Sequence, residues 1–112
     1  MDFALNEEQK EFKARCRKFV REVIRPAARK HDEEESIPWE VIKEARKQGF
    51  GTLESIQRSA ADPEGQFQVI SAEEFHWGCA GTALAISGSG LAAAGIASSG
   101  TPEQIAQWVP EC

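Results

Sequence analysis

The run from His31 to Glu35 gathers side chains that could bind a metal ion. His31 is followed by Asp32 and by three consecutive glutamates, Glu33 to Glu35. A metal ion needs ligands that converge from several directions, whereas this run is contiguous on one polar segment. We therefore interpret the run as a solvated helix face and expect no metal site in this chain.

Glu73 and Glu74 could serve as a general acid and a general base. Neighbouring residues on a helix point about 100° apart, so these two carboxylates cannot flank one substrate atom. We expect one of them to accept a buried or interfacial salt bridge. His76 has no Cys or Ser at a spacing typical of a nucleophile and its base, so we expect it to be a packed or exposed histidine.

Two further patterns also fall short of a catalytic set. The segment Gly88-Ser-Gly90 has no predicted strand before it and no Gly-Lys-Ser/Thr after it, so it is not a phosphate loop. Cys16, Cys79 and Cys112 are too few and too far apart for a zinc site. We expect reduced thiols, with Cys16 and Cys79 as small buried hydrophobic residues. The residues themselves predict no catalytic group in this chain.

Charge is distributed unevenly along the chain. The net charge is -5, twelve of the thirteen Lys and Arg residues lie in positions 1–50, and residues 59–112 carry six acidic residues and no basic one. Nucleic-acid binding needs a basic face, so the acidic balance argues against it. The first fifteen residues are mostly polar, unlike a signal peptide, and we expect a soluble protein in the cytoplasm.

Helical signals recur along the chain, and no segment shows convincing strand alternation. Residues 5–24 are predicted to form a helix that begins with Asn6 and Gln9 as a capping-box pair. One apolar stripe runs along it, made of Phe12, Cys16, Phe19, Val20 and Val23. Pro26 should break or kink that helix and begin the next. The further predicted helices are 38–48, ended by Gly49, then 66–78, and a last helix capped by Thr101, with Pro102 and Gln104 in its first turn. We read 50–65 as a loop. The chain is predicted to be all-α, a bundle of five to six helices in one domain, 1–112.

The segment from Gly78 to Gly100 has no charged residue and holds six Gly, seven Ala and four Ser. It could span a membrane, but it has few large aliphatic residues and no basic flanks. It could be a linker, but alanines favour helix. The remaining alternative, a buried helix whose small residues let a neighbour or a slim ligand come close, is the one we favour, so we expect no membrane span.

The order of these segments resembles the N-terminal helical domain of acyl-CoA dehydrogenases. The resemblance rests on the opening helix "LNEEQKEFKARCRKFVREVIRPAARKHDEE", on "IPWEVIKEARKQGF", on "ISAEEFHWGCAGTALAI" and on "GTPEQIAQWVPEC". It covers nearly the whole chain. It implies FAD-dependent α,β-dehydrogenation of an acyl-CoA thioester in the complete enzyme, which is expected to be a homo-oligomer.

In that family the small-residue helix forms one wall of the slot for the acyl chain. The resemblance implies that Ala83, Leu84, Ser87, Gly88 and Leu91 form this wall, or that they only pack against neighbouring helices. The flavin contacts and the catalytic glutamate belong to a β-domain and a C-terminal helical domain that would follow Cys112. We therefore expect this chain alone to be inactive and not to bind FAD.

One departure from the family pattern lies between the third and fourth predicted helices. The family's glycine-rich loop is replaced there by "GTLESIQRSAADPEG". A second hypothesis is a stand-alone helical module without catalysis that binds a partner chain or a hydrophobic ligand. If the chain ends at Cys112, we expect exposed apolar surface and self-association.

Overall fold

Helices form the fold of the residues that the computed structural model describes, which are 4–52, 54–55, 58, 61–88 and 90–111. In these residues α1, η1 and α2 form one continuous rod, further helices follow it, and there is no strand. The all-α prediction is confirmed. The elements, in chain order, are α1 (Glu7–Phe19), η1 (Val20–Ile24), α2 (Arg25–Glu33), α3 (Trp39–Lys47), α5 (Gln66–Gly78), α6 (Ala80–Ser87), α7 (Gly90–Ser99), α8 (Pro102–Trp108) and η2 (Val109–Glu111).

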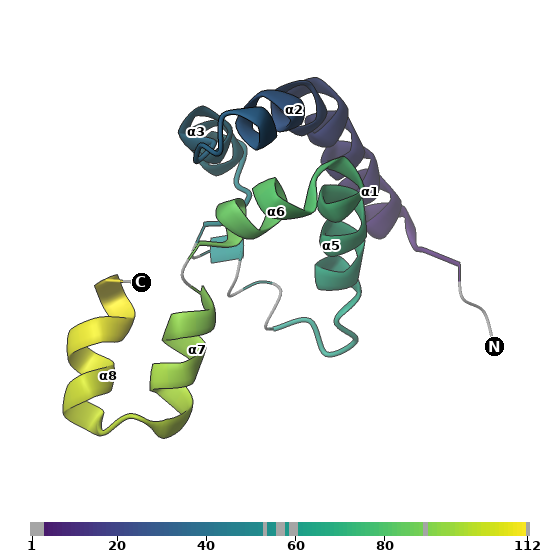
Figure 1. Ribbon diagram of the computed structural model, residues 1–112. Coiled ribbons are helices and arrows are strands. Elements are labelled where there is room, and N and C mark those ends of the chain that lie inside the picture. The colour runs from purple at the N-terminus through teal and green to yellow at the C-terminus, as the bar shows by residue number, and fades with distance from the viewer. Residues whose placement is uncertain (1–3, 53, 56–57, 59–60, 89, 112) are drawn as a thin grey trace.

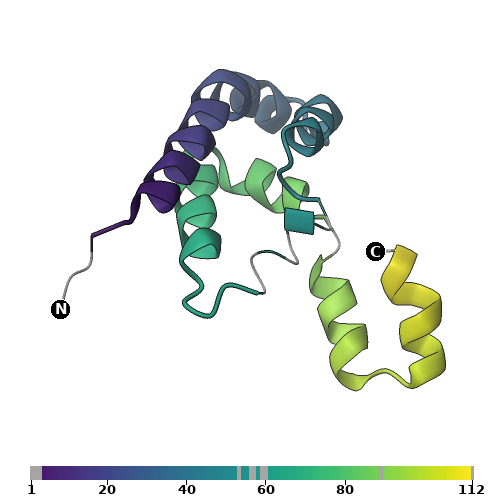
Figure 2. The same cartoon turned by 180° about the vertical axis from the view of Figure 1, so that it is seen from behind.

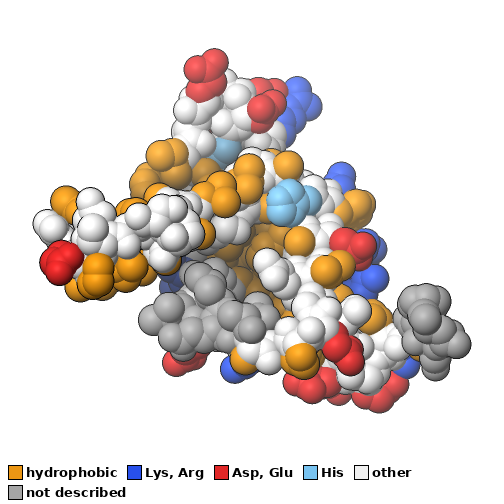
Figure 3. All heavy atoms as spheres, turned by 90° about the horizontal axis from the view of Figure 1, so that it is seen from below, with side chains coloured by type: hydrophobic (Ala, Val, Ile, Leu, Met, Phe, Trp, Pro, Cys, Tyr) orange, Lys and Arg blue, Asp and Glu red, His pale blue; other side chains and the backbone are white. Residues whose placement is uncertain are grey.

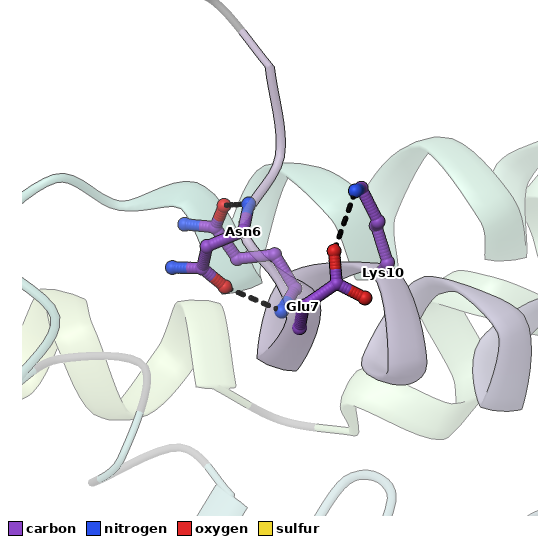
Figure 4. Close-up of polar contacts among 4 residues, drawn as sticks. Asn6, Glu7 and Lys10 are labelled. Carbon is purple, nitrogen blue, oxygen red and sulfur yellow. Dashed lines mark hydrogen bonds and ion pairs between the residues drawn. The ribbon is translucent and has the colours of Figure 1, made fainter.

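The predicted capping box begins α1. The Asn6 side chain accepts the backbone N–H of Gln9, and the Gln9 side chain accepts the backbone N–H of Asn6, both at 2.9 Å. One turn further on, Lys10 pairs with Glu7 at 2.7 Å (Figure 4). Thr101 and Gln104 form the same reciprocal box at the start of α8. Both predicted helix starts are therefore confirmed. Capping is a local interaction between residues three apart, so the residue types predict it directly.

The first rod bends near Pro26 but does not end there. Proline lacks an N–H, and its ring collides with the carbonyl group four residues earlier. The five residues of η1 form a π-helix, in which the N–H of Arg25 bonds to the carbonyl group of Val20. This wider turn carries the chain into α2, which has Pro26 in its first turn. Figures 1 and 2 show α2 running off at an angle to α1.

The core lies where α1 and η1 pack against α5, with α3 and α6 closing it. Three phenylalanines meet there. The ring centroids of Phe19 and Phe50 are 5.1 Å apart, those of Phe50 and Phe75 are 5.1 Å apart, and those of Phe19 and Phe75 are 5.8 Å apart. Burying a Phe side chain contributes about 1.5–3 kcal/mol, so this cluster holds the N-terminal rod on α5.

Because Gly78 has no side chain, the backbone at the end of α5 lies directly against side chains of the first rod. A Cβ atom at this position would lie 2.5 Å from Cγ1 of Val20 and 3.0 Å from Cγ2 of Ile24. Both of those side chains are fully buried. At this glycine, close approach to a neighbouring helix is the reason for a small residue. The predicted helix 66–78 is confirmed, because α5 begins at Gln66 and ends at Gly78, and Cys79 after it is extended.

The prediction of a single buried helix between Gly78 and Gly100 is wrong. The segment forms two helices, α6 and α7, with a bend of 51° between them. Gly88 stands at the break with φ of 66° and ψ of -145°, a conformation open in practice to glycine alone. Thr82, Ala83 and Ile86 are buried in α6, whereas no described residue of α7 is buried.

No single helix among the described residues is long and apolar enough to cross a membrane. The bent pair of α6 and α7 reaches that length and composition only when its two helices are taken together. In Figure 1 α7 and α8 form a hairpin that projects from the rest of the bundle.

The predicted loop 50–65 is only partly a loop. Glu54, Ser55 and Arg58 are helical, and a turn closes where the N–H of Gly65 bonds to the carbonyl group of Asp62. Residues 53, 56–57 and 59–60 of this loop lie outside the described residues, as do Ser89 of the small-residue segment and Cys112.

Candidate functional site

A pocket of about 480 Å³ opens between α1, α5 and α6. Its apolar surface comes from Phe12, Phe50 and Phe75, together with Ala83 and Ile86 of α6. Figure 3 shows hydrophobic side chains inside a hollow in the middle of this face. The volume lies in the range of small-molecule sites in proteins, about 300–1,000 Å³.

Gly51 brings the chain close against one side of this pocket. A Cβ atom on Gly51 would lie 2.5 Å from the carbonyl oxygen of Ile86, and its φ of 65° also favours glycine. The backbone between α3 and α5 therefore lies directly against α6. Gly51 is also the first residue of the segment 51–65, in which the sequence departs from the family pattern. Because Gly51 lies against Ile86, its backbone forms part of the pocket wall.

Three polar side chains of the pocket, those of Ser71, His76 and Ser87, bond to the backbone of their own helices. The Ser71 hydroxyl donates to the carbonyl oxygen of Gln68 at 3.0 Å, and the Ser87 hydroxyl donates to that of Ala83 at 3.1 Å. Nδ1 of His76 lies 2.8 Å from the carbonyl oxygen of Ala72. His76 is thus an exposed histidine bonded to its own helix, one of the two outcomes that the sequence predicted.

The five predicted wall residues fall into two groups. Ala83 and Ser87 line the pocket. Leu84 and Leu91 are exposed, with 58% and 86% of their surface accessible, and Gly88 is exposed between them. The structure thus brings two of the five into one cavity and leaves the other three on the surface of α6, on the bend and on α7.

Glu74 is the buried salt-bridge acceptor expected within the Glu73–Glu74 pair. Its side chain is 2% exposed and receives both Nε and Nη2 of Arg17, the latter at 2.8 Å, while Nζ of Lys13 lies 3.9 Å away. The hydrogen bond to Glu74 is the main cause that raises the pKa of Arg17. Because both oxygens of Glu74 are engaged by Arg17, the carboxylate joins α5 to α1 and is not placed for catalysis.

Trp77 extends this contact between α1 and α5. The guanidinium carbon of Arg17 lies 4.4 Å from the centre of its indole ring, and that of Arg25 lies 4.5 Å from it. Cations over an indole ring are attracted by its electron-rich face. These side chains join α5 to α1 and to the start of α2, and they lie outside the pocket.

His31 departs from the solvated face that the sequence predicted. It is buried, with Nδ1 2.7 Å from the Ser36 hydroxyl and Nε2 2.7 Å from Oε1 of Glu40. The backbone N–H of Glu40 is the main cause that lowers the pKa of this carboxyl, and the hydrogen bond from His31 adds to it. The imidazole therefore ties the end of α2 to the start of α3. Among the described residues no group of three or more His, Cys, Asp or Glu could hold a metal ion.

The two described thiols differ in their surroundings. Cys16 is buried in the core, and desolvation there raises its pKa to about 12. Cys79 is partly buried, and a hydrogen bond with the Thr82 side chain is the main cause that lowers its pKa. The prediction of a buried residue is confirmed for Cys16 and is wrong for Cys79, which is only partly buried, and neither thiol lines the pocket.

Sequence reasoning missed the part of the pocket that comes from outside α6. Phe12 was placed only on an apolar stripe, and Phe50 and Phe75 carried no functional assignment. The mixture of aromatic and small residues on separate segments was the available signal. It could not be read, because the sequence does not show which segments meet.

Comparison with known proteins finds relatives over nearly the whole chain. A family model described as "Acyl-CoA dehydrogenase, N-terminal domain" matches residues 6–112. The "Probable medium-chain specific acyl-CoA dehydrogenase 2, mitochondrial" of Caenorhabditis briggsae is 34% identical over 105 residues, which are 93% of this chain and 26% of that protein. "Isobutyryl-CoA dehydrogenase, mitochondrial" of Dictyostelium discoideum is 41% identical over 49 residues, which are 44% of this chain and 12% of that protein. The chain thus spans about a quarter of the first relative, and no solved structure gives a significant match.

Proposed function

The chain belongs to the acyl-CoA dehydrogenase family as its N-terminal domain, and on this premise we propose that it forms one wall of the acyl-chain slot in an enzyme that dehydrogenates acyl-CoA. The observation that carries the proposal is the pocket beside Ala83 and Ser87, two of the five predicted wall residues. The enzyme's activity and its acyl-CoA substrate are part of the proposal.

The exposed side of α6 and α7 suits the other part of this wall. Leu84, Gly88 and Leu91 are exposed, and no charged residue lies between Gly78 and Gly100. A hydrocarbon chain laid against this surface meets no charged group that would have to be stripped of water. The chain's part in the reaction is therefore to bind the acyl group and to exclude water from it.

The residues described do not by themselves fit FAD. The diphosphate of that cofactor needs cations or converging N–H groups, and no Lys or Arg lines the pocket. A second hollow of about 250 Å³ has Arg15 and Arg58, but Glu8 and Glu11 line it too and would repel a diphosphate. We propose that FAD, which supplies the redox chemistry when bound, and the catalytic base are held by parts of the enzyme outside these 112 residues.

The proposal extends to assembly and location. Residues 1–112 act as one helical domain that packs on the remaining domains of the enzyme, which is a homo-oligomer. The predicted cytoplasmic location stays a prediction, whereas the names of both relatives describe those proteins as mitochondrial. The alternative, a non-catalytic helical interaction module, is also supported by the exposed apolar residues of α7, and the experiment below distinguishes the two.

The test measures dehydrogenation of acyl-CoA thioesters by the native polypeptide that carries this chain, purified with its cofactor. Leu84→Arg and Leu91→Arg place a charge on the proposed wall without disturbing buried residues. We expect each to lower kcat/KM by about tenfold or more, because a charge against the acyl chain must lose its water. Ala97→Arg, at another exposed position of α7, is the matched control. Absence of any dehydrogenation supports the interaction module, and unchanged kcat/KM in both leucine variants contradicts the wall.

A further inference from the structure

We propose that the outer side of the first rod binds the surface of an anionic membrane. Residues 13–30 of this rod carry eight Lys and Arg residues but a single acidic residue, Glu22. The proposal concerns attachment to the headgroups of a lipid bilayer and not a segment that crosses it. It goes beyond the proposed function, because the residues that carry it do not line the pocket between α1, α5 and α6.

Three cations form a stripe on the side of the rod that faces solvent. Lys18, Arg21 and Arg25 follow one another at intervals of three and four residues, and all three are exposed. We call these three residues the basic stripe. The rod faces the core with a different set, Cys16, Phe19, Val20 and Ile24. In Figures 1 and 2 the rod lies along an outer edge of the bundle, so the stripe is open to a large partner.

The basic stripe has no carboxylate partner among the described residues. The ion pairs of the rod use its other cations, which are Lys10, Lys13, Arg17 and Arg29. Like charges on one helix face repel each other, and an anionic surface compensates that repulsion. Anionic lipids attract each nearby Lys or Arg strongly enough to raise affinity about fivefold. The stripe therefore has charge available for such a surface.

Trp77 adds a side chain of the kind found at membrane interfaces. Its ring centre lies 4.5 Å from the guanidinium carbon of Arg25, and the indole is exposed. Tryptophan prefers the headgroup region of a bilayer, which accommodates both its apolar ring and its N–H group. The stacking also restricts the Arg25 side chain, so less conformational entropy is lost when this guanidinium meets a headgroup. Trp77 and Arg25 thus support the same kind of partner.

The shape of the rod favours a broad surface over a small anion or an acidic peptide. None of the three residues of the basic stripe lines either of the two hollows described above. A small anion needs donors that converge on it, and an extended peptide needs a groove or a sheet edge. A bilayer needs neither, because separate headgroups can each meet one cation. A membrane is therefore the partner that this convex stripe fits best.

The experiment measures cosedimentation of the native polypeptide that carries this chain with lipid vesicles. One preparation is phosphatidylcholine alone, and the other contains about one-third phosphatidylglycerol. We expect binding to the anionic vesicles only. Raising the salt concentration from about 0.1 M to about 1 M shortens the screening length from about 10 Å to about 3 Å and should abolish the binding. The double variant Arg21→Gln with Arg25→Gln should weaken it about 25-fold, fivefold for each charge.

Two further double variants separate charge on the stripe from other effects. Arg21→Lys with Arg25→Lys keeps both charges and should bind almost as tightly as the wild type, because the attraction depends on charge. Lys43→Gln with Arg46→Gln removes the same charge from exposed positions of α3 and should leave binding nearly unchanged. Circular dichroism checks that each variant keeps its helices.

Four results would overturn the inference. If neutral vesicles are bound as well and salt has no effect, the exposed apolar residues of α6 and α7 make the contact. If both glutamine pairs weaken binding equally, the attraction follows net charge and not the stripe. If the lysine pair binds as weakly as the Arg21→Gln, Arg25→Gln pair, charge is not the cause. If neither vesicle is bound, the stripe has no membrane partner, and binding to polyglutamate would then assign it to an acidic protein.

Discussion

Replacing Gly78 with alanine tests whether close backbone contact explains this glycine. The new methyl group would lie 2.5 Å from Cγ1 of Val20 and 3.0 Å from Cγ2 of Ile24, both in the core. Overpacking of this kind costs about 1–3 kcal/mol. Alanine is worth up to about 1 kcal/mol over glycine inside a helix, and less at the last residue of α5. We therefore expect the free energy of unfolding to fall by about 1–2 kcal/mol.

Gly95→Ala is the matched control, because nothing lies within 4 Å of its added Cβ atom inside α7. The same chemical change should there raise the free energy of opening of the hairpin of α7 and α8 by up to about 1 kcal/mol and leave the unfolding of the core unchanged. Urea unfolding followed by circular dichroism measures both variants. In a Val20→Ala background the cost of Gly78→Ala should shrink, since the colliding methyl group is gone. The reasoning is refuted if Gly78→Ala is as stable as the wild type, or if Val20→Ala leaves its cost unchanged.

Three other changes probe interactions across the fold. Glu74→Gln removes the buried charge that pairs with Arg17 and should lower the free energy of unfolding by about 1–2 kcal/mol. Glu73→Gln, at the exposed neighbouring residue, is the control and should change the free energy of unfolding little. Equal effects of the two variants in thermal unfolding would contradict the assignment of Glu74 as the buried salt-bridge acceptor. Burial raises the pKa of Cys16 from 9.0 to about 12, so the stability that comes from its protonated thiol is complete below pH 9 and is lost as the pH rises toward 12. Urea unfolding between pH 8 and roughly 11 should therefore show a steeper fall in the free energy of unfolding for the wild type than for Cys16→Ala. Parallel curves for the two proteins would disprove this prediction. Gly88→Ala forces a side chain into a glycine conformation and should cost about 1–3 kcal/mol, a loss that a calorimetric unfolding midpoint equal to that of the wild type would rule out.

Local signals in the sequence predicted the fold well. Asn6 with Gln9 and Thr101 with Gln104 form capping boxes within four residues, and Gly49 takes a positive φ just after α3. These features depend on neighbours in the chain, so their residue types predict them directly.

Features that depend on distant residues were harder to predict. His31 is buried because Ser36 and Glu40 turn back onto both of its ring nitrogens, which charge patterning cannot show. The break at Gly88 was hidden because glycine is also tolerated inside helices, so only the backbone angles reveal its role. The pocket could be predicted only on its α6 side, where Ala83 and Ser87 are one turn apart, because its aromatic surface comes from three other segments.

The hairpin of α7 and α8 has a consequence for cooperativity. The two helices pack on each other, and no described residue in either is buried. The hairpin can therefore open without disrupting the phenylalanine cluster, and the chain should contain two cooperative units of unequal stability. Amide hydrogen exchange should be fast through both helices of the hairpin and slow along α1 and α5. If a binding partner slows amide exchange in the hairpin alone, that partner contacts α7 and α8 and not the core.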